Sequence, residues 1–290
     1  MSGEKLSSLE RANRWLQRLA ESLTRPTAPF LGEALYAGVD LGTADVVMVV
    51  LDRDGLPVIG RLRWTGVVRE GLVFDFAGAV QVVRELKAEI ESLLHRPLEF
   101  AATGIPPGIT GRDALVPHYV LEEAGLQVTG IVDEPTAAAL ALGLTEGAVV
   151  DIGGGTTGIS VLEGGRVVYT ADEPTGGRHL TLVLEGRYGL NFEEAERLKR
   201  ERGMTPEIQD TLRPVLEKMA SIVQRHLRGR TVRTLYLAGG TCDFPGIESV
   251  MEEIVGIPVV KPTHPLLVTP LGLALSCYQT LQVTANPPNH

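Results

Sequence analysis

Apolar and polar residues alternate along this chain with two different periods. From residue 36 to residue 62, short runs of apolar, β-branched residues are divided by one turn at Gly42 and another at Gly55. Such runs between glycine and aspartate turns are typical of strands, so this stretch predicts three strands joined by two hairpins. The stretch from residue 147 to residue 171 repeats the same order of runs and turns.

The two stretches correspond at their turns. Asp40 corresponds to Asp151, and Gly42 corresponds to Gly153. An internal repeat of this kind indicates two similar lobes, each built on a sheet. We therefore expect each lobe to offer one hairpin loop to a shared cleft.

Between and after these stretches, apolar residues recur at spacings of three and four residues, which predicts amphipathic helices. Strand-like runs lie between the helices, and this alternation is typical of an α/β protein. The expected helices cover residues 77–95, 114–125, 135–143, 191–202, 205–227, 245–255 and 270–281, and further strands are expected within 99–110, 127–134 and 234–240.

The N-terminal segment stands apart from this pattern. Residues 5–23 place leucines at helical spacing between arginines and glutamates, and Pro26 and Pro29 follow. This predicts an amphipathic helix and a linker. The sequence leaves open whether the helix packs on its own domain, pairs weakly in a dimer or docks in a groove on a partner protein.

The second hairpin contains the spacing of a dinucleotide-binding turn, because Gly153, Gly155 and Gly158 fit G-x-G-x-x-G. Such a turn must open a helix, whose amides hold the pyrophosphate. The residues that follow favour a strand, so the glycines form a hairpin loop instead. Glycine lets backbone amides approach phosphates closely, and threonine adds hydroxyl donors. The candidate phosphate-binding residues are Gly42, Thr43, Gly153, Gly154, Gly155, Thr156 and Thr157.

Three acidic residues lie next to these loops. Asp40 and Asp151 end the strands that precede the two loops, where paired carboxylates can hold a hydrated Mg²⁺. Glu134 lies at a strand-to-helix turn, from which a carboxylate can orient or deprotonate an attacking water. These three residues are the candidate catalytic set for phosphoryl transfer, with the two aspartates as metal ligands.

Composition narrows the range of partners. The formal net charge of −9 argues against nucleic acid as the main partner, because binding a phosphate backbone needs a basic face. Cys242 and Cys277 lack metal-ligand spacing and the chain has no HExxH pair, so we expect no transition-metal site. No run approaches the about 18 apolar residues of a membrane span, so we expect no span. The N-terminus lacks an uninterrupted apolar stretch, so we expect no secretory signal.

Five motifs in a fixed order resemble the superfamily of actin, heat-shock chaperone and sugar-kinase ATPases. They are VDLGT, VDEPTAAALALG, VVDIGGGTTGISVL, LYLAGGTCDFPGI and TPLGLAL, and they extend over nearly the whole chain. The resemblance implies a two-lobed actin-like ATPase fold, with duplicated ribonuclease-H-like lobes around a cleft that binds ATP or ADP with Mg²⁺. The implied units are an N-terminal helix and linker (1–35), a first lobe (36–143), a second lobe (144–265) and a helix that returns to the first lobe, with a tail (266–290).

The same resemblance implies further nucleotide contacts. Gly176 and Gly177 match residues that approach the terminal phosphate. Glu196 and Lys199 match contacts to the base or ribose, although a surface pair at i,i+3 on a helix also explains their spacing. The motif that lies against the adenosine supplies Gly239, Gly240 and Thr241.

The chain further resembles the EutJ family of ethanolamine-utilisation proteins, which are compact and chaperone-like. The resemblance rests on VVREGLVFDFAGA, ADEPTGGRHLTLV, GLNFEEAERLK and LLVTPLGLAL. It implies a cytoplasmic, ATP-binding and ATP-hydrolysing protein, associated with a bacterial microcompartment. The implied clients are the cobalamin-dependent ethanolamine ammonia-lyase, its activation machinery or the shell proteins. In that setting the N-terminal helix and linker resemble an encapsulation tag.

Two departures from the chaperone pattern affect the expected activity. The peptide-binding domain and lid of DnaK-type chaperones have no counterpart, so we expect a client to bind the ATPase body or the N-terminal arm. The lysine that those chaperones place near the terminal phosphate has no match before Gly71, and Arg69 does not fit the motif. We therefore expect an Mg-dependent ATPase that is slow or stimulated by a partner.

The sequence leaves two other functions open. A small-molecule kinase needs a carboxylate base in its pocket, and Asp75 and Asp113 are the candidates, although neither lies in a kinase motif. A nucleotide-gated scaffold, which binds ATP and hydrolyses little of it, agrees with the missing lysine. Faster ADP formation with a metabolite would favour the kinase, and assembly on adding ATP would favour the scaffold.

Overall fold

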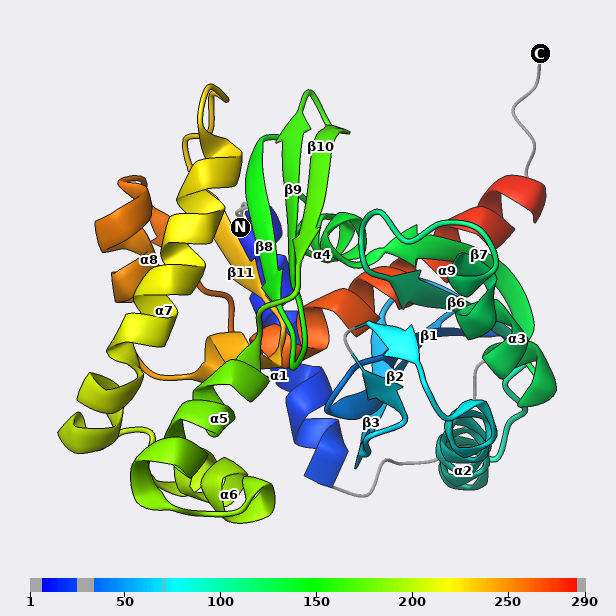
Figure 1. Cartoon of the computed structure of the whole chain (residues 1–290). Coiled ribbons are helices and arrows are strands. Elements are labelled where there is room, and N and C mark those ends of the chain that lie inside the picture. Colours follow the sequence, from blue (N-terminus) through cyan, green and yellow to red (C-terminus); the bar gives the residue numbers. More distant parts are fainter. Residues whose placement is uncertain (1–6, 25–33, 70, 286–290) are drawn as a thin grey trace, which may run out of the picture.

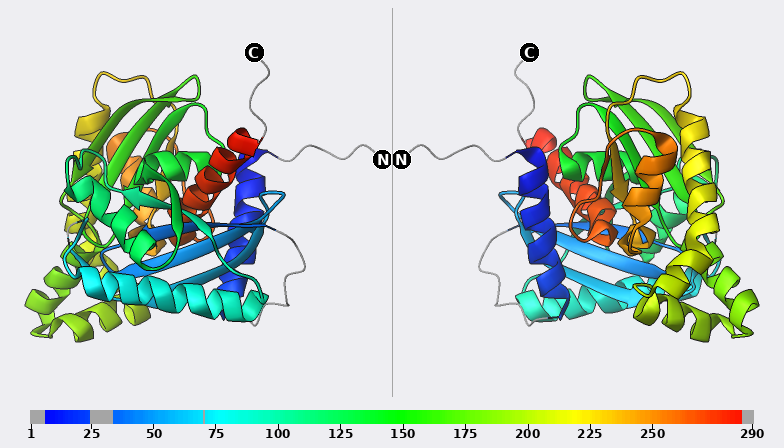
Figure 2. Two further views of the ribbon diagram at one scale, coloured as in Figure 1. Left: turned by 90° about the vertical axis from the view of Figure 1, so that its right-hand side faces the viewer. Right: turned by 90° about the vertical axis from the view of Figure 1, so that its left-hand side faces the viewer.

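Two lobes, each built on a five-stranded sheet, form the frame of the molecule (Figure 1). The computed structural model describes residues 7–24, 34–69 and 71–285. Helices cover the outer face of each sheet, and a layer of helices lies between the two sheets (Figures 1 and 2).

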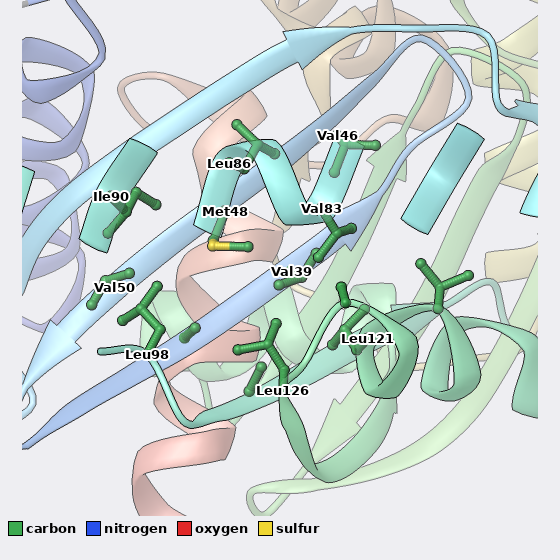
Figure 3. Packing of buried hydrophobic residues seen from close by; sticks show 14 of the residues in the cluster. Val39, Val46, Met48, Val50, Val83, Leu86, Ile90, Leu98, Leu121 and Leu126 are labelled. Carbon is green, nitrogen blue, oxygen red and sulfur yellow. The ribbon is translucent and has the colours of Figure 1, made fainter. Parts of the chain in front are cut away.

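The first lobe consists of the first sheet and the helices on its outer face. In chain order its elements are β1 (Leu35–Leu41), β2 (Asp45–Asp52), β3 (Pro57–Trp64), the small hairpin of β4 (Val68–Arg69) and β5 (Leu72–Val73), α2 (Phe76–Leu94), β6 (Phe100–Ile105), the 3-10 helix η1 (Asp113–Leu115), α3 (Val116–Glu123) and β7 (Gln127–Asp133). The sheet has the order β3-β2-β1-β6-β7. Buried side chains of α2 and α3, among them Leu86 and Leu121, pack against Val39 and Met48 of this sheet (Figure 3).

The second lobe is constructed in the same way. In chain order its elements are β8 (Gly147–Ile152), β9 (Thr157–Glu163), β10 (Arg166–Glu173), α5 (Gly177–Tyr188), α6 (Phe192–Arg202), α7 (Pro206–Leu227), β11 (Leu235–Ala238), the 3-10 helix η2 (Gly240–Asp243), α8 (Ile247–Val255) and β12 (Val259–Val260). Its sheet has the order β10-β9-β8-β11-β12, with three antiparallel strands followed by two parallel ones, as in the first sheet. The repeat in the sequence therefore corresponds to two sheets of one topology.

The layer between the sheets connects the lobes. It consists of α1 (Ser8–Thr24), α4 (Glu134–Leu142), the 3-10 helix η3 (Pro265–Leu267) and α9 (Val268–Ala285). Its buried core includes Val47 of the first sheet and Val149 of the second. Both lobes thus rest on the same helices.

The strand β2 is apolar without interruption because both of its faces are covered. Val46, Met48 and Val50 belong to the core formed with α2, whereas Val47 and Val49 belong to the core of the central layer. Successive side chains of a strand point to opposite faces, so a strand covered on both faces needs apolar residues at every position.

Two glycines let α9 lie unusually close to its neighbours. A Cβ atom on Gly272 would lie 1.8 Å from the carbonyl oxygen of Ala137 in α4. A Cβ atom on Gly38 in β1 would lie 2.2 Å from the backbone nitrogen of Ala274. Because backbone atoms of other elements occupy these positions, α9, α4 and β1 form one closely packed connection between the lobes.

The helix α9 corrects one expectation from composition. Residues Pro265–Val283 are long and apolar enough to cross a membrane, judged by length and composition alone, and within the described part of the chain this is the one such helix. However, 56% of this window is buried inside the protein. A helix that is apolar on all sides suits a position between two packed layers. The expectation that no run reaches this length was therefore wrong for α9.

The helix α1 packs on its own chain. Leu16 is fully buried, and the amide of Gly60 in β3 donates a hydrogen bond of 2.8 Å to Oγ of Ser22. At the other lobe, the amide of Thr263 donates a bond of 2.9 Å to Oδ1 of Asn13. Among the alternatives for this helix, the structure thus shows packing on the chain itself, in contact with both lobes. The expected linker and the first residues of the expected helix lie outside the described residues.

The sequence patterns did not predict the β4–β5 hairpin, α5, β12 or the short 3-10 helices η2 and η3. The hairpin strands and β12 have two residues each, too few for a periodic pattern. The helix α5 begins with Gly177 and contains the β-branched residues Thr181 and Val183, so its local propensity is weak. Tertiary packing of Leu180 and Leu184 in the core of the second lobe stabilises it instead.

Candidate functional site

Three carboxylates converge where the lobes meet. Asp40 lies near the end of β1, Asp151 near the end of β8, and Glu134 is the first residue of α4. The helix α4 begins there because Asp133 caps it, accepting a hydrogen bond of 3.1 Å from the amide of Thr136. The structure thus brings all three predicted catalytic residues together.

Burial and mutual repulsion raise the pKa values of these groups. The pKa of Asp40 lies well above its usual range because of burial and the charges of Asp151 and Asp45. Burial also raises the pKa of Glu134 well above its usual range, and Asp40 and Asp151 add to this effect. Burial raises the pKa of Asp151 to about 6, although a hydrogen bond from Thr269 acts in the opposite direction. The cluster is therefore a place where a cation stabilises the charged carboxylates.

Two further carboxylates belong to this cluster and were not among the predicted residues. Asp45, at the start of β2, is 8% exposed, and burial raises its pKa to about 6. Burial also raises the pKa of Asp172 in β10 to about 6, against a hydrogen bond from Thr156. Both residues lie beside recognised motifs, in LGTAD and ADEPTGG. Sequence spacing alone does not show which way their side chains point.

The carboxylates at this site suit a cation that takes only some of its ligands from the protein. Asp40 and Asp151 come from opposite lobes. In the described part of the chain, no group of three or more His, Cys, Asp or Glu side chains is placed to hold a metal ion. Mg²⁺ is usually bound by one or two carboxylates, with waters and substrate phosphates as the other ligands. The residues present therefore fit a hydrated Mg²⁺ that binds together with phosphates.

The two glycine loops lie side by side. One connects β1 to β2 and contains Gly42 and Thr43, and the other connects β8 to β9. A Cβ atom on Gly154 would lie 3.2 Å from Cβ of Ala44 and 3.5 Å from Cβ of Thr43. A Cβ atom on Gly42 would lie 2.8 Å from the carbonyl oxygen of Asp45, so a larger residue would distort the first loop. The backbones of the two loops, one from each lobe, thus lie next to each other.

Residues at the start of α5 and in η2 hold the second loop. The carbonyl oxygen of Gly153 accepts hydrogen bonds from the amide of Gly177 at 3.0 Å and from Oγ1 of Thr241 at 2.8 Å. A Cβ atom on Gly176 would lie 2.6 Å from the same oxygen. Gly155 is buried within the loop. The structure therefore places Gly176, Gly177 and Thr241 directly against the loop and shows that they fix its shape.

The two threonines of the second loop differ in their surroundings. Thr157 is fully buried, and its hydroxyl donates a hydrogen bond of 2.6 Å to the carbonyl oxygen of Thr175. Its hydroxyl is thus engaged inside the sheet. Thr156 is 8% exposed and contacts Asp172. Its side chain therefore faces the carboxylate cluster.

The predicted adenosine motif lies beside Asp151. Gly239 has a φ of +87°, and a Cβ atom there would lie 2.3 Å from Oδ1 of Asp151. A Cβ atom on Gly240 would lie 3.0 Å from Cδ1 of Leu266. Any residue other than glycine at position 239 would therefore clash with the carboxylate of Asp151.

Glu196 and Lys199 pair with each other and with α5. Nζ of Lys199 donates hydrogen bonds of 2.7 Å to Oε2 of Glu196, 2.9 Å to Oγ1 of Thr181 and 3.2 Å to the carbonyl oxygen of Gly177. The pair at i,i+3 is therefore present. It also ties α6 to the start of α5, next to the second glycine loop.

One side-chain contact joins the lobes across their junction. The guanidinium of Arg200 in α6 lies 3.7 Å from the ring centroid of Trp64 at the end of β3. Trp64 is paired in register with Asp45, and the positive charge of Arg200 lowers the pKa of that carboxyl against the effect of burial. Opening of the lobes would separate Arg200 from both residues.

The residues considered for other functions lie elsewhere. Asp75 caps α2 by accepting a hydrogen bond of 2.9 Å from the amide of Gly78, and Asp113 is exposed in η1. Neither carboxylate belongs to the cluster at the junction of the lobes. Arg69 stacks at 3.8 Å on the ring of Phe74. The side chain of Arg69 is thus committed to a contact outside the cluster.

Known proteins resemble this chain over most of its length. A protein of Escherichia coli (strain K12), "Ethanolamine utilization protein EutJ", is 46% identical over 91% of this chain and 94% of its own length. The family profile of Type IV pilus assembly protein PilM matches residues 137–268, and the profile of Hsp70 protein matches residues 78–184.

Solved structures extend the comparison to the fold. The crystal structure of ethanolamine utilization protein EutJ from Carboxydothermus hydrogenoformans has a TM-score of 0.87 at 49% identity, covering 93% of this chain and 99% of that chain. MreB 5 of Spiroplasma citri bound to AMPPNP has a TM-score of 0.72 at 16% identity, covering 89% and 99%. The second likeness concerns the fold alone. Together they confirm the predicted actin-like ATPase fold.

Proposed function

This chain belongs to the EutJ family of ethanolamine utilization proteins, and from that premise we propose that it binds Mg-ATP between its lobes and hydrolyses it. The observation that carries the proposal is the meeting of two glycine loops, one from each lobe, beside a cluster of buried and half-buried carboxylates. Loop amides bind phosphates, and clustered carboxylates bind a divalent cation.

The residues have distinct roles in this proposal. Asp40 and Asp151, one from each lobe, hold the hydrated cation. The amides of Gly42, Gly154 and Gly155, with the hydroxyls of Thr43 and Thr156, bind the phosphates. Gly153 shapes the loop instead, because its amide donates a hydrogen bond of 3.0 Å to the carbonyl oxygen of Thr156. Glu134 orients the attacking water and accepts its proton. Mg²⁺, when bound, neutralises charge on the phosphates.

The residues proposed to contact the adenosine all belong to the second lobe. Glu196 and Lys199 keep their mutual ion pair while their outer atoms contact the ribose or base. Gly239 and Gly240 provide a flat backbone surface next to Asp151. Closure of the lobes on the nucleotide brings these second-lobe groups toward Asp40 of the first lobe.

The biological role in the proposal is that of a chaperone-like protein in ethanolamine utilization. Its clients are the cobalamin-dependent ethanolamine ammonia-lyase, its activation machinery or microcompartment shell proteins, and it works in the cytoplasm. The names of the EutJ relatives support the link to ethanolamine utilization. If α1 serves as an encapsulation tag, it must first leave its site, because its apolar face is buried against the chain itself.

Phosphate release from Mg-ATP tests the proposed activity. We expect release by the wild type and loss of release in Glu134→Ala and Asp151→Ala. The control is Asp113→Ala, which removes an exposed carboxylate outside the cluster. Bound ATP without release above background would contradict hydrolysis by the protein alone.

One observation favours a second candidate, the nucleotide-gated scaffold. DnaK-type chaperones place a lysine near the terminal phosphate, and Arg69 is the cation nearest in sequence to that position. The guanidinium of Arg69 stacks on the ring of Phe74. A scaffold would bind ATP, release little phosphate and assemble on adding ATP. Sedimentation with and without Mg-ATP separates the two candidates, because the ATPase proposal does not require assembly.

A further inference from the structure

Asp151 is held by the side chain of Thr269, the first residue of the motif TPLGLAL, which was not among the predicted site residues. Oγ1 of Thr269 in α9 donates a hydrogen bond to Oδ2 of Asp151, and Thr269 is 2% exposed. The other carboxylate oxygen, Oδ1, lies against the position where Gly239 lacks a side chain. Both oxygens of Asp151 are thus constrained: Oδ2 accepts a hydrogen bond, and Oδ1 lies against the backbone at Gly239.

The hydroxyl of Thr269 is directed away from its own helix. A threonine in a helix often bonds to the carbonyl four residues earlier, which here belongs to Pro265. That carbonyl instead accepts a hydrogen bond of 3.0 Å from the amide of Gly239. The arrangement links Thr269, Pro265 and Gly239 around one carboxylate.

The bond also crosses between structural units. Asp151 lies on β8 of the second lobe, whereas α9 is packed against the first lobe through Gly38 and against α4 through Gly272. A rotation of the second sheet relative to α9 would therefore change the contact between Thr269 and Asp151. The other residues around Thr269 on α9, among them Val268 and Leu271, are buried and apolar.

We propose that Thr269 is a positioning residue, which orients the carboxylate of Asp151 toward the cation and couples that orientation to the placement of α9. This inference rests on the proposed Mg-ATP site and adds a residue to it. Removing a hydrogen bond that orients a metal ligand typically lowers metal affinity by about 10- to 100-fold.

Titration of ATP into the full chain by calorimetry, at several Mg²⁺ concentrations and in EDTA, tests the proposal. Thr269→Val keeps the shape of the side chain and removes the donor, and Thr269→Ser keeps the donor. We expect Thr269→Val to lower the affinity for ATP about 10- to 100-fold in Mg²⁺ and to leave the affinity in EDTA unchanged. Thr269→Ser should restore most of the Mg²⁺-dependent affinity.

Each other result has a defined meaning. If Thr269→Val loses affinity equally with and without Mg²⁺, Thr269 has a structural role only and the proposal is wrong. Wild-type affinity in Thr269→Val would refute it as well. If wild-type binding itself does not depend on Mg²⁺, the proposed Mg-ATP site fails, and the role of Thr269 fails with it. Thr269→Ala provides a second variant without the donor if the valine variant does not fold.

Discussion

The pKa of Asp151 makes the stability of the nucleotide-free protein depend on pH in a defined direction. The pKa is about 6 in the folded state, against 3.8 for the unperturbed group. Between these values the folded state binds more protons than the unfolded state does. The free energy of unfolding therefore falls as pH rises from about 4 to about 6 and is level above that range.

The magnitude follows from the shift. One pKa unit corresponds to about 1.4 kcal/mol, so the shift of Asp151 corresponds to about 3 kcal/mol. Other carboxyls titrate in the same range, and the pKa of Glu173 is shifted in the opposite direction. The effect of Asp151 is therefore measured as the difference between the wild type and Asp151→Asn, which has the same shape and does not titrate.

The assay is urea unfolding in EDTA at pH 4 and at pH 7. We expect the stability of the wild type relative to Asp151→Asn to fall by about 2 kcal/mol between the two pH values, somewhat less than the full shift because at pH 4 the unfolded group is already partly ionised. Asp113→Asn, an exposed substitution, should show no such change. A difference between wild type and Asp151→Asn that is independent of pH, or that changes in the opposite direction, would refute the electrostatic account of the cluster.

Three further substitutions test the packing of the molecule. Gly272→Ala places a Cβ atom against the backbone of Ala137 and should lower the free energy of unfolding in urea by about 3 kcal/mol. Leu16→Ala removes a fully buried side chain of α1 and should lower it by about 2 to 5 kcal/mol. Trp64→Leu removes the ring on which Arg200 stacks and should speed the release of a fluorescent ADP analogue in stopped flow by about 2- to 5-fold. Unchanged stability of either packing variant would show that α9 or α1 is not held as described. An unchanged release rate in the Trp64 variant would show that its contact with Arg200 does not hold the lobes together.

Much of the fold follows from local patterns in the sequence. The hairpins were predictable because strands such as β2 are continuous apolar runs between turns. Glu134 was predictable because it lies at the turn from a strand-like run to a helical one, directly before Pro135. The pairing of Asp40 with Asp151 followed from the internal repeat. Equivalent strands of the two sheets place these equivalent residues at corresponding positions.

The remainder depends on contacts between distant segments. Asp172 and Thr269 reach the cluster from β10 and α9, and no spacing in the sequence brings them together. The helix α1 was predictable as amphipathic, but the sequence does not show that its apolar face is covered by the chain itself. Thr157 was expected to face a phosphate because it follows the glycines, whereas its place in β9 turns its hydroxyl toward Thr175.

The most direct test of the central claim is a crystal structure of the protein with Mg²⁺ and AMPPNP. The account predicts one metal ion between Asp40 and Asp151, with the phosphates against Gly42 and the loop of residues 153–155. Nucleotide bound away from these loops, or a metal ion that contacts neither aspartate, would contradict it.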